Sequence, residues 1–167
     1  MKSLDQKDNT NIGYWEQVLQ APTPAYQELF DAEKKYLTEN ISSDSFVLDI
    51  GCGEGRNMQS IFEKTKFVYG IDNDSKAVED AQKRFDGIDT VKIFNASADK
   101  LPFENEMFDV VVIFHLIYNL NSDEIKKKVF SEIWRVLKKG GILLLDSYSE
   151  IAFDERMKIY SLIDAPI

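Results

Sequence analysis

The fold of this chain is decided by residues 46–55, whose sequence is Phe46-Val47-Leu48-Asp49-Ile50-Gly51-Cys52-Gly53-Glu54-Gly55. The first half is a short apolar run, which is typical of a strand covered on both faces of a sheet. The glycines allow the backbone to turn sharply and to pass close to a ligand. A helix is expected from about Arg56, and its unpaired N–H groups point back at the same turn, where they suit an anionic group. Together these features predict a binding site for a nucleotide-like cofactor.

The composition favours a single domain and disfavours several classes of partner. The chain has 167 residues, 44% of them hydrophobic, which is enough for one buried core. Its formal net charge of −9 would repel duplex DNA and anionic membranes. No stretch approaches the roughly 20 apolar residues of a membrane span, and the polar start has no apolar core for a signal peptide. We therefore expect a cytoplasmic protein with neither nucleic acid nor membrane as its partner.

Strand and helix patterns alternate along the chain downstream of residue 45. The expected strands are residues 46–50, 67–71, 91–94, 108–114 and 141–146. Such alternation predicts a parallel sheet with right-handed crossovers. We therefore expect an α/β fold of the Rossmann-like, doubly wound kind, with a mainly parallel sheet and helices on both of its faces.

Helix signals lie between these strands and before them. Asp74 and Asn121 are placed as N-caps of two helices, and Gly140 is the expected end of the second. Residues 1–44 are expected to form a helical segment that packs over the cofactor site. Residues 45–167 are expected to form the cofactor-binding part, which ends in a further helix, so that the whole chain is one compact domain.

Three acidic residues occupy the predicted strand ends, where ligands of such sheets bind: Asp49, Asp72 and Asp99. The carboxylate of Asp72 can accept hydrogen bonds from both hydroxyls of a ribose, in NAD and in S-adenosylmethionine alike. Asp49 would repel a pyrophosphate but suits the ammonium and sulfonium groups of S-adenosylmethionine. Asp99 can accept from an adenine amino group. Arg56 stands where the dinucleotide fingerprint G-x-G-x-x-G has its third glycine, so S-adenosylmethionine is favoured over NAD.

With these features the chain resembles the class I S-adenosylmethionine-dependent methyltransferases, in particular the small-molecule and ubiquinone-biosynthesis-like group. The resemblance is carried in order by residues 47–55, Gly70-Ile71-Asp72-Asn73-Asp74, Ala98-Asp99-Lys100-Leu101-Pro102-Phe103, Phe108-Asp109-Val110-Val111 and Glu132-Ile133-Trp134-Arg135-Val136-Leu137-Lys138-Lys139-Gly140-Gly141. It implies S-adenosylmethionine as the cofactor and a small molecule as the methyl acceptor. It also implies cofactor contacts by Asp49, Gly51, Cys52, Gly53, Asp72, Asn73, Ala98, Asp99 and His115.

His115, the only histidine, is the candidate catalytic residue. Methyl transfer from a sulfonium is an in-line displacement, so the protein mainly has to hold the acceptor in line and to exclude water. A base is needed only where the acceptor must lose a proton, and His115 follows the fourth strand, where the methyl group is expected. Tyr118 and Asn119 are weaker candidates from the same segment. No metal site is predicted, and Cys52 is expected to be a small apolar turn residue rather than a reactive thiol.

Members of this family usually continue after the fifth strand with a helix and two further strands, but this sequence has residues for the helix alone, so the two strands are missing. The fifth strand would then be an exposed sheet edge. Three explanations stay open: a truncated chain, a second copy of the chain that covers the edge as a homodimer, and a minimal protein whose last helix folds over the edge. Two other functions stay open. One is an S-adenosylmethionine-binding module without turnover, a truncated or degenerate paralogue. The other, with less support, is an NAD-linked oxidoreductase.

Overall fold

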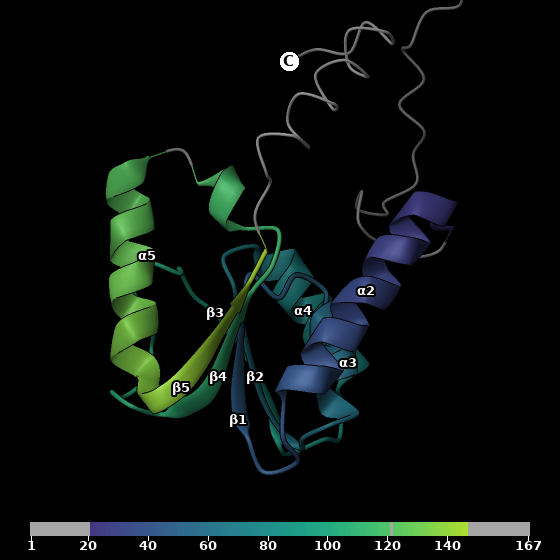
Figure 1. Ribbon diagram of the computed structural model, residues 1–167, viewed down its shortest axis with the longest axis horizontal. Helices are drawn as coiled ribbons and strands as arrows, with labels where there is room; N and C mark the ends of the chain where they lie inside the picture. The colour runs from purple at the N-terminus through teal and green to yellow at the C-terminus, as the bar shows by residue number, and fades with distance from the viewer. Residues whose placement is uncertain (1–20, 121, 147–167) are drawn as a thin grey trace, which may run out of the picture.

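The computed structural model describes residues 21–120 and 122–146. Within these residues one five-stranded sheet has the order β3-β2-β1-β4-β5, and all neighbouring strands are parallel (Figure 1). Its strands are β1 (Phe46–Ile50), β2 (Phe67–Asp72), β3 (Val91–Asn95), β4 (Phe108–Ile113) and β5 (Leu137–Leu145). The expected helix after β5 and the expected cap Asn121 lie outside the described residues.

The helices cover both faces of this sheet. They are α2 (Pro24–Asn40), α3 (Arg56–Phe62), α4 (Ser75–Arg84), the short 3-10 helix η1 (Ile117–Asn119) and α5 (Asp123–Val136). In Figure 1, α2, α3 and α4 lie on one side of the sheet and α5 lies on the other. Val47 of β1 accordingly joins one core with Met58, whereas its neighbour Leu48 joins a second core with Val129. This double burial explains the unbroken apolar run of β1 and confirms the predicted Rossmann-like fold.

The strand order reverses at the centre of the sheet. From β1 the chain passes through α3 to β2 and then to β3, whereas β4 and β5 lie on the other side of β1. In open α/β sheets ligands bind at such a reversal, outside the carboxyl ends of the strands. The arrangement therefore places the candidate site at the carboxyl ends of β1 and β4.

Helix α5 ends earlier than the sequence indicated. We expected it to continue to Gly140, but α5 ends at Val136 and β5 begins at Leu137. Leu137 already pairs with β4, and Nζ of Lys138 lies 2.8 Å from both carboxylate oxygens of Asp109 on that strand. Strand pairing and this ion pair outweigh the local signals for a helix end. At its start, α5 is capped by a side chain one position after the predicted one, that of Ser122.

The connection from β3 to β4 is a loop, and two side chains of α5 hold it. Oε2 of Glu132 accepts a hydrogen bond from the backbone N–H of Leu101 at 2.7 Å. The guanidinium of Arg135 donates to the carbonyl oxygens of Leu101 and Phe103, at 3.1 and 2.7 Å. The hydrogen bond from Arg135 holds the pKa of Glu132 below its usual value, so both side chains are charged at neutral pH. This clamp fixes the segment that follows the predicted adenine contacts.

Two further observations concern the partners that the sequence disfavoured or suggested. None of the helices in residues 21–120 and 122–146 is long and apolar enough to cross a membrane. Over the same residues β5 pairs with β4 alone, so it is an edge strand of the described sheet.

Candidate cofactor site and active site

The glycine loop after β1 is tied to the end of β2 by hydrogen bonds. The N–H groups of Gly51 and Cys52 both donate to the carbonyl oxygen of Ile71, each at 2.9 Å. The N–H of Gly53 donates to Oδ2 of Asp72 at 2.8 Å, and the N–H of Asp74 donates to Oδ1 of Asp72 at 2.9 Å. A carboxylate has about four lone-pair directions, so Asp72 can hold the loop and still accept from a ligand.

A hollow of about 70 Å³ lies beyond the carboxyl ends of β1, β2 and β3. Its lining includes the predicted cofactor residues Gly51, Asp72, Asn73, Ala98 and Asp99. A larger hollow of about 420 Å³ lies beside α4 and β3, but no predicted site residue lines it. We place the site at the smaller hollow because the glycine loop and two of the strand-end acids converge there.

Two predicted residues of the glycine loop, Cys52 and Gly53, are not among the residues that line this hollow. The side chain of Cys52 is buried in the core with Met58, and burial together with nearby Asp49 raises the pKa of its thiol. An unreactive, small apolar side chain fits that position. Gly53 has a φ of +52°, and a Cβ built on it would meet no heavy atom within 4 Å. The backbone of the loop is therefore open on this side to an approaching ligand.

Asp49 is a buried carboxylate that lacks a complete set of partners. It is 1% exposed, and its Oδ2 has no hydrogen-bond partner among the described residues. Burial raises the pKa of Asp49 to about 7, and the negative charges of Asp72 and Glu33 add to this rise while Arg56 opposes it. An unpaired buried charge is costly, so the site favours a cationic group beside Asp49.

His115 lies two residues after the end of β4 and is held in an unusual backbone conformation. Its φ is +59°, in the left-handed region that non-glycine residues rarely adopt. Its N–H donates to Oδ1 of Asp146 at 2.7 Å, and its carbonyl oxygen accepts from the side chain of Asn119 at 2.6 Å. Strained residues cluster at functional sites, where the surroundings fix them, and this is the position that the sequence proposed.

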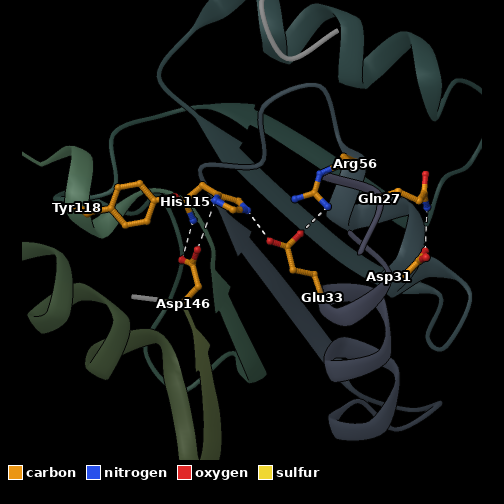
Figure 2. A network of polar contacts seen from close by, with 7 residues as sticks. All are labelled: Gln27, Asp31, Glu33, Arg56, His115, Tyr118 and Asp146. Carbon is orange, nitrogen blue, oxygen red and sulfur yellow. Dashed lines mark hydrogen bonds and ion pairs between the residues drawn. The ribbon is translucent and has the colours of Figure 1, made fainter. Parts of the chain in front are cut away.

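The imidazole of His115 lies within a network of charged and polar side chains (Figure 2). Nε2 lies 2.5 Å from Oε1 of Glu33, and Nδ1 lies 2.6 Å from the hydroxyl of Tyr118. Oδ2 of Asp146, which follows β5, is 3.4 Å from Nδ1. On the far side of Glu33, Nη1 of Arg56 is 2.6 Å from Oε2. Four segments of the chain thus supply one continuous polar network at the strand ends.

Glu33 is a site residue that the sequence analysis missed. It is 7% exposed on α2, and the sequence showed it only as one position of an apolar stripe that includes Phe30 and Leu37. A charged residue inside such a stripe was the signal that could have identified it. Arg56, noted before as the start of a helix and as a replaced glycine, pairs with Glu33, and its guanidinium carbon lies 4.3 Å from the ring centre of Phe30. Burial alone would raise the pKa of Glu33, but His115 and Arg56 outweigh it and lower that pKa.

The family follows from a comparison with known proteins. Residues 47–141, more than half of the chain, match the family model described as a methyltransferase domain. This chain belongs to the class I S-adenosylmethionine-dependent methyltransferases. The matched range runs from β1 to β5 and so includes the glycine loop, Asp72 and His115.

Three similar proteins show how much of a relative or of a solved structure this chain covers. The ubiquinone/menaquinone biosynthesis C-methyltransferase of Wigglesworthia glossinidia brevipalpis is 30% identical over 125 residues, which are 71% of this chain and 49% of that protein. The solved YcgJ protein of Bacillus subtilis has a TM-score of 0.65 at 24% identity, with 81% of this chain and 58% of that chain covered. Phosphoethanolamine N-methyltransferase 1 of Haemonchus contortus, solved with phosphoethanolamine and S-adenosylhomocysteine, has a TM-score of 0.65 at 22% identity, over 82% and 31%. The chain thus spans about half the length, or less, of these proteins.

The residues of this chain fit the cofactor of its family. The buried Oδ2 of Asp49 has no described partner and lies beside the glycine loop, as a cationic amino-acid portion would require. The open side of Gly53 leaves room for a ligand against the backbone. Asp72 and Asp99 face one hollow at the strand ends, where a ribose and an adenine need acceptors.

Proposed function

We propose that this chain binds S-adenosylmethionine and transfers its methyl group to a small-molecule acceptor by in-line displacement. The single observation that carries the proposal is Asp49, a carboxylate that is 1% exposed and has an unpaired oxygen beside the glycine loop. A pyrophosphate would add negative charge at this point, whereas an ammonium or sulfonium group would neutralise it. The site therefore supports S-adenosylmethionine and disfavours the NAD-linked alternative.

The predicted cofactor contacts have separate roles in this proposal. Asp72 would accept from the ribose hydroxyls, and Asp99 with the backbone around Ala98 would hold the adenine. The glycine loop from Gly51 to Gly53 would surround the methionine portion, with Asp49 beside its charged groups. A further hydrogen bond from Oγ of Ser97 to Oδ1 of Asp99, at 2.6 Å, orients that carboxylate. The remaining predicted contacts are the backbone of Cys52, together with Asn73 and His115.

The residues of the chain would position the acceptor and manage its proton. When bound, S-adenosylmethionine supplies a methyl group that is already activated by the positive sulfur. The protein holds the acceptor in line and excludes water, which lowers the entropic part of the barrier. His115, at the end of β4, is the candidate base for an acceptor that must lose a proton. The acidic surroundings, which include Glu33 and Asp146, favour a neutral or cationic acceptor.

A binding module without turnover is the second candidate function. Against it stands the network around His115, which cofactor binding alone does not require. A cytoplasmic location and a homodimer through the β5 edge complete the proposal.

Calorimetric titration with S-adenosylhomocysteine, with NAD as the parallel ligand, tests the cofactor assignment. We expect micromolar binding of the first and none of the second. Binding of NAD alone, or of neither ligand, would contradict the proposal. The protein can then be incubated with S-adenosylmethionine and a broad panel of acceptors. An enzyme converts S-adenosylmethionine to S-adenosylhomocysteine, even if slowly, whereas a binding module produces no S-adenosylhomocysteine.

Replacement of Asp72 by alanine should weaken binding of S-adenosylhomocysteine. The variant loses the proposed ribose acceptor and the hydrogen bond that holds Gly53 at 2.8 Å. A lost charge-assisted hydrogen bond costs roughly 1.5–3 kcal/mol, so we expect the Kd to rise about 10- to 100-fold. Calorimetry measures this change.

Asp74→Ala is the matched control for this prediction. Asp74 is the N-cap of α4, and its side chain accepts from the N–H groups of Lys76 and Ala77. Its loss should cost about 1 kcal/mol of stability and leave the Kd within about twofold. Equal losses of affinity in the two variants would mean that reduced order after β2, and not a lost ribose contact, weakens binding.

A further inference from the structure

The contacts of Glu33 determine which nitrogen of His115 carries the proton. The pKa of Glu33 is lowered, so its carboxylate is ionised at neutral pH and can only accept hydrogen bonds. Nε2 of His115, at 2.5 Å from Oε1, must therefore be the donor. In a neutral ring this leaves Nδ1 without a proton and able to accept from the hydroxyl of Tyr118 at 2.6 Å.

Charged groups surround the imidazole of His115 on both sides. Glu33 lies at Nε2, and Oδ2 of Asp146 is 3.4 Å from Nδ1. The other charged groups that face this pair are Arg56 of α3, bound to Glu33, and Asp49 of β1, which interacts electrostatically with His115. The ring thus lies between two carboxylates, one facing each of its nitrogens.

A metal ion would be the other use of Glu33, His115 and Asp146. One potential ligand atom of each lies within 4.8 Å of the others. However, the two carboxylates face opposite nitrogens of one ring, Nε2 at 2.5 Å and Nδ1 at 3.4 Å, so one metal-bound nitrogen cannot serve both. Arg56 also places a positive charge 2.6 Å from Glu33. The geometry is that of a hydrogen-bonded relay.

We propose that Glu33 is a positioning residue that fixes the tautomer of His115, so that Nδ1 and Tyr118 form a proton relay for an acceptor that carries a weakly acidic hydroxyl. This inference rests on the proposed methyl transfer and assigns its acceptor class. The acceptor O–H bond breaks and its proton passes to the oxygen of Tyr118. The proton of Tyr118 passes in turn to Nδ1 of His115. The electron pair of the acceptor oxygen forms the new bond to the methyl carbon, and the pair of the broken carbon–sulfur bond stays on sulfur.

Nitrogen-15 NMR of the imidazole tests the tautomer directly. The signals need no assignment because His115 is the only histidine in the chain. At alkaline pH, where a histidine ring is neutral, we expect the proton on Nε2 in the wild-type protein. A proton on Nδ1 would overturn the proposal, whether or not any variant folds.

Glu33→Gln is the variant that isolates the role of the carboxylate. Arg56 will keep the amide oxygen, so the amide nitrogen faces Nε2 and donates to it, and the ring proton should move to Nδ1. Glu63→Gln is the matched control, because Glu63 forms another ion pair between α2 and α3, with Lys34 at 2.7 Å. Tyr118→Phe should keep the proton on Nε2. An unchanged tautomer in Glu33→Gln, or the same change in Glu63→Gln, would overturn the role of Glu33.

Phenol and anisole serve as probes of the acceptor class. Added to the complex with S-adenosylhomocysteine, phenol should shift the Nδ1 signal, whereas anisole, which has no hydroxyl proton, should not. An equal response to both probes, or none to phenol, would overturn the hydroxyl assignment.

The proposed function fails by a different readout. If the wild-type protein did not bind S-adenosylhomocysteine, the methyltransferase proposal would fail while the tautomer of His115 stayed as proposed. In Glu33→Gln the Kd for S-adenosylhomocysteine should change less than in Asp72→Ala, because the side chain of Glu33 contacts His115 and Arg56 and none of the acids at the strand ends.

Discussion

Asp49→Asn is expected to stabilise the fold at alkaline pH and to weaken cofactor binding. The pKa of Asp49 is raised to about 7, so the folded state holds this proton more tightly than the unfolded chain. Wild-type stability therefore falls as pH rises from about 4 to about 7, at about 1.4 kcal/mol per pH unit, and asparagine escapes this loss. The advantage of the variant should be about 2 kcal/mol larger at pH 8.5 than at pH 5.5. Urea unfolding at the two pH values measures it.

The same substitution should raise the Kd for S-adenosylmethionine and S-adenosylhomocysteine by about 10-fold or more, because both ligands carry an ammonium group. A loss confined to S-adenosylmethionine would place Asp49 beside the sulfonium group instead. Unchanged affinity for both ligands, measured by calorimetry, would contradict the proposed cofactor site.

Asp109→Asn is a control of opposite sign. Burial of Asp109 is outweighed by Lys138 and the N–H of Phe46, which hold the pKa of Asp109 below its usual value. The ionised carboxylate of Asp109 therefore stabilises the fold at pH values above its usual pKa, and this stabilisation is lost as the pH falls. Asp109→Asn should accordingly be less stable than wild type at neutral pH. If Asp49→Asn also destabilised the protein at pH 8.5, the carboxylate of Asp49 would have a partner that offsets its burial.

Gly55→Ala should destabilise the protein by about 2–4 kcal/mol, because a strained backbone and an overlap act together. Gly55 is the N-cap residue of α3 and has a φ of +85°. A Cβ at this position would lie 2.8 Å from Cε2 of Phe85. Phe85 is 7% exposed, and its ring centre lies 6.3 Å from the ring centre of Phe62, so the ring has little room to move. Urea unfolding gives the loss.

Gly87→Ala separates the two causes of that loss. Gly87 has a φ of +77°, close to that of Gly55, but a Cβ there would meet no heavy atom within 4 Å. It should therefore show the backbone cost alone, about 1 kcal/mol. Equal losses in the two variants would mean that Phe85 moves aside without cost.

Much of the fold was predictable because its signals are local. The apolar runs of the strands, the glycines after β1 and the cap of α4 at Asp74 each reflect the geometry of a few adjacent residues. The parallel order then brought Asp72 and Asp99 to one hollow, as expected from their positions at strand ends. The end of α5 could not be predicted in this way, since pairing of Leu137 with β4 outweighs the helix-end signals that follow it.

Periodicity and turn chemistry act over a few residues, so the layered α/β fold, the glycine loop and the positions of the acids at the strand ends were predictable from the sequence. The surroundings of His115 instead depend on contacts between distant segments. Glu33 lies 82 positions away in sequence and reaches the ring because α2 docks on α3 through Arg56 and Phe30. That docking depends on shape and charge between two helices, and no local pattern encodes where a side chain of one helix meets the end of a distant strand.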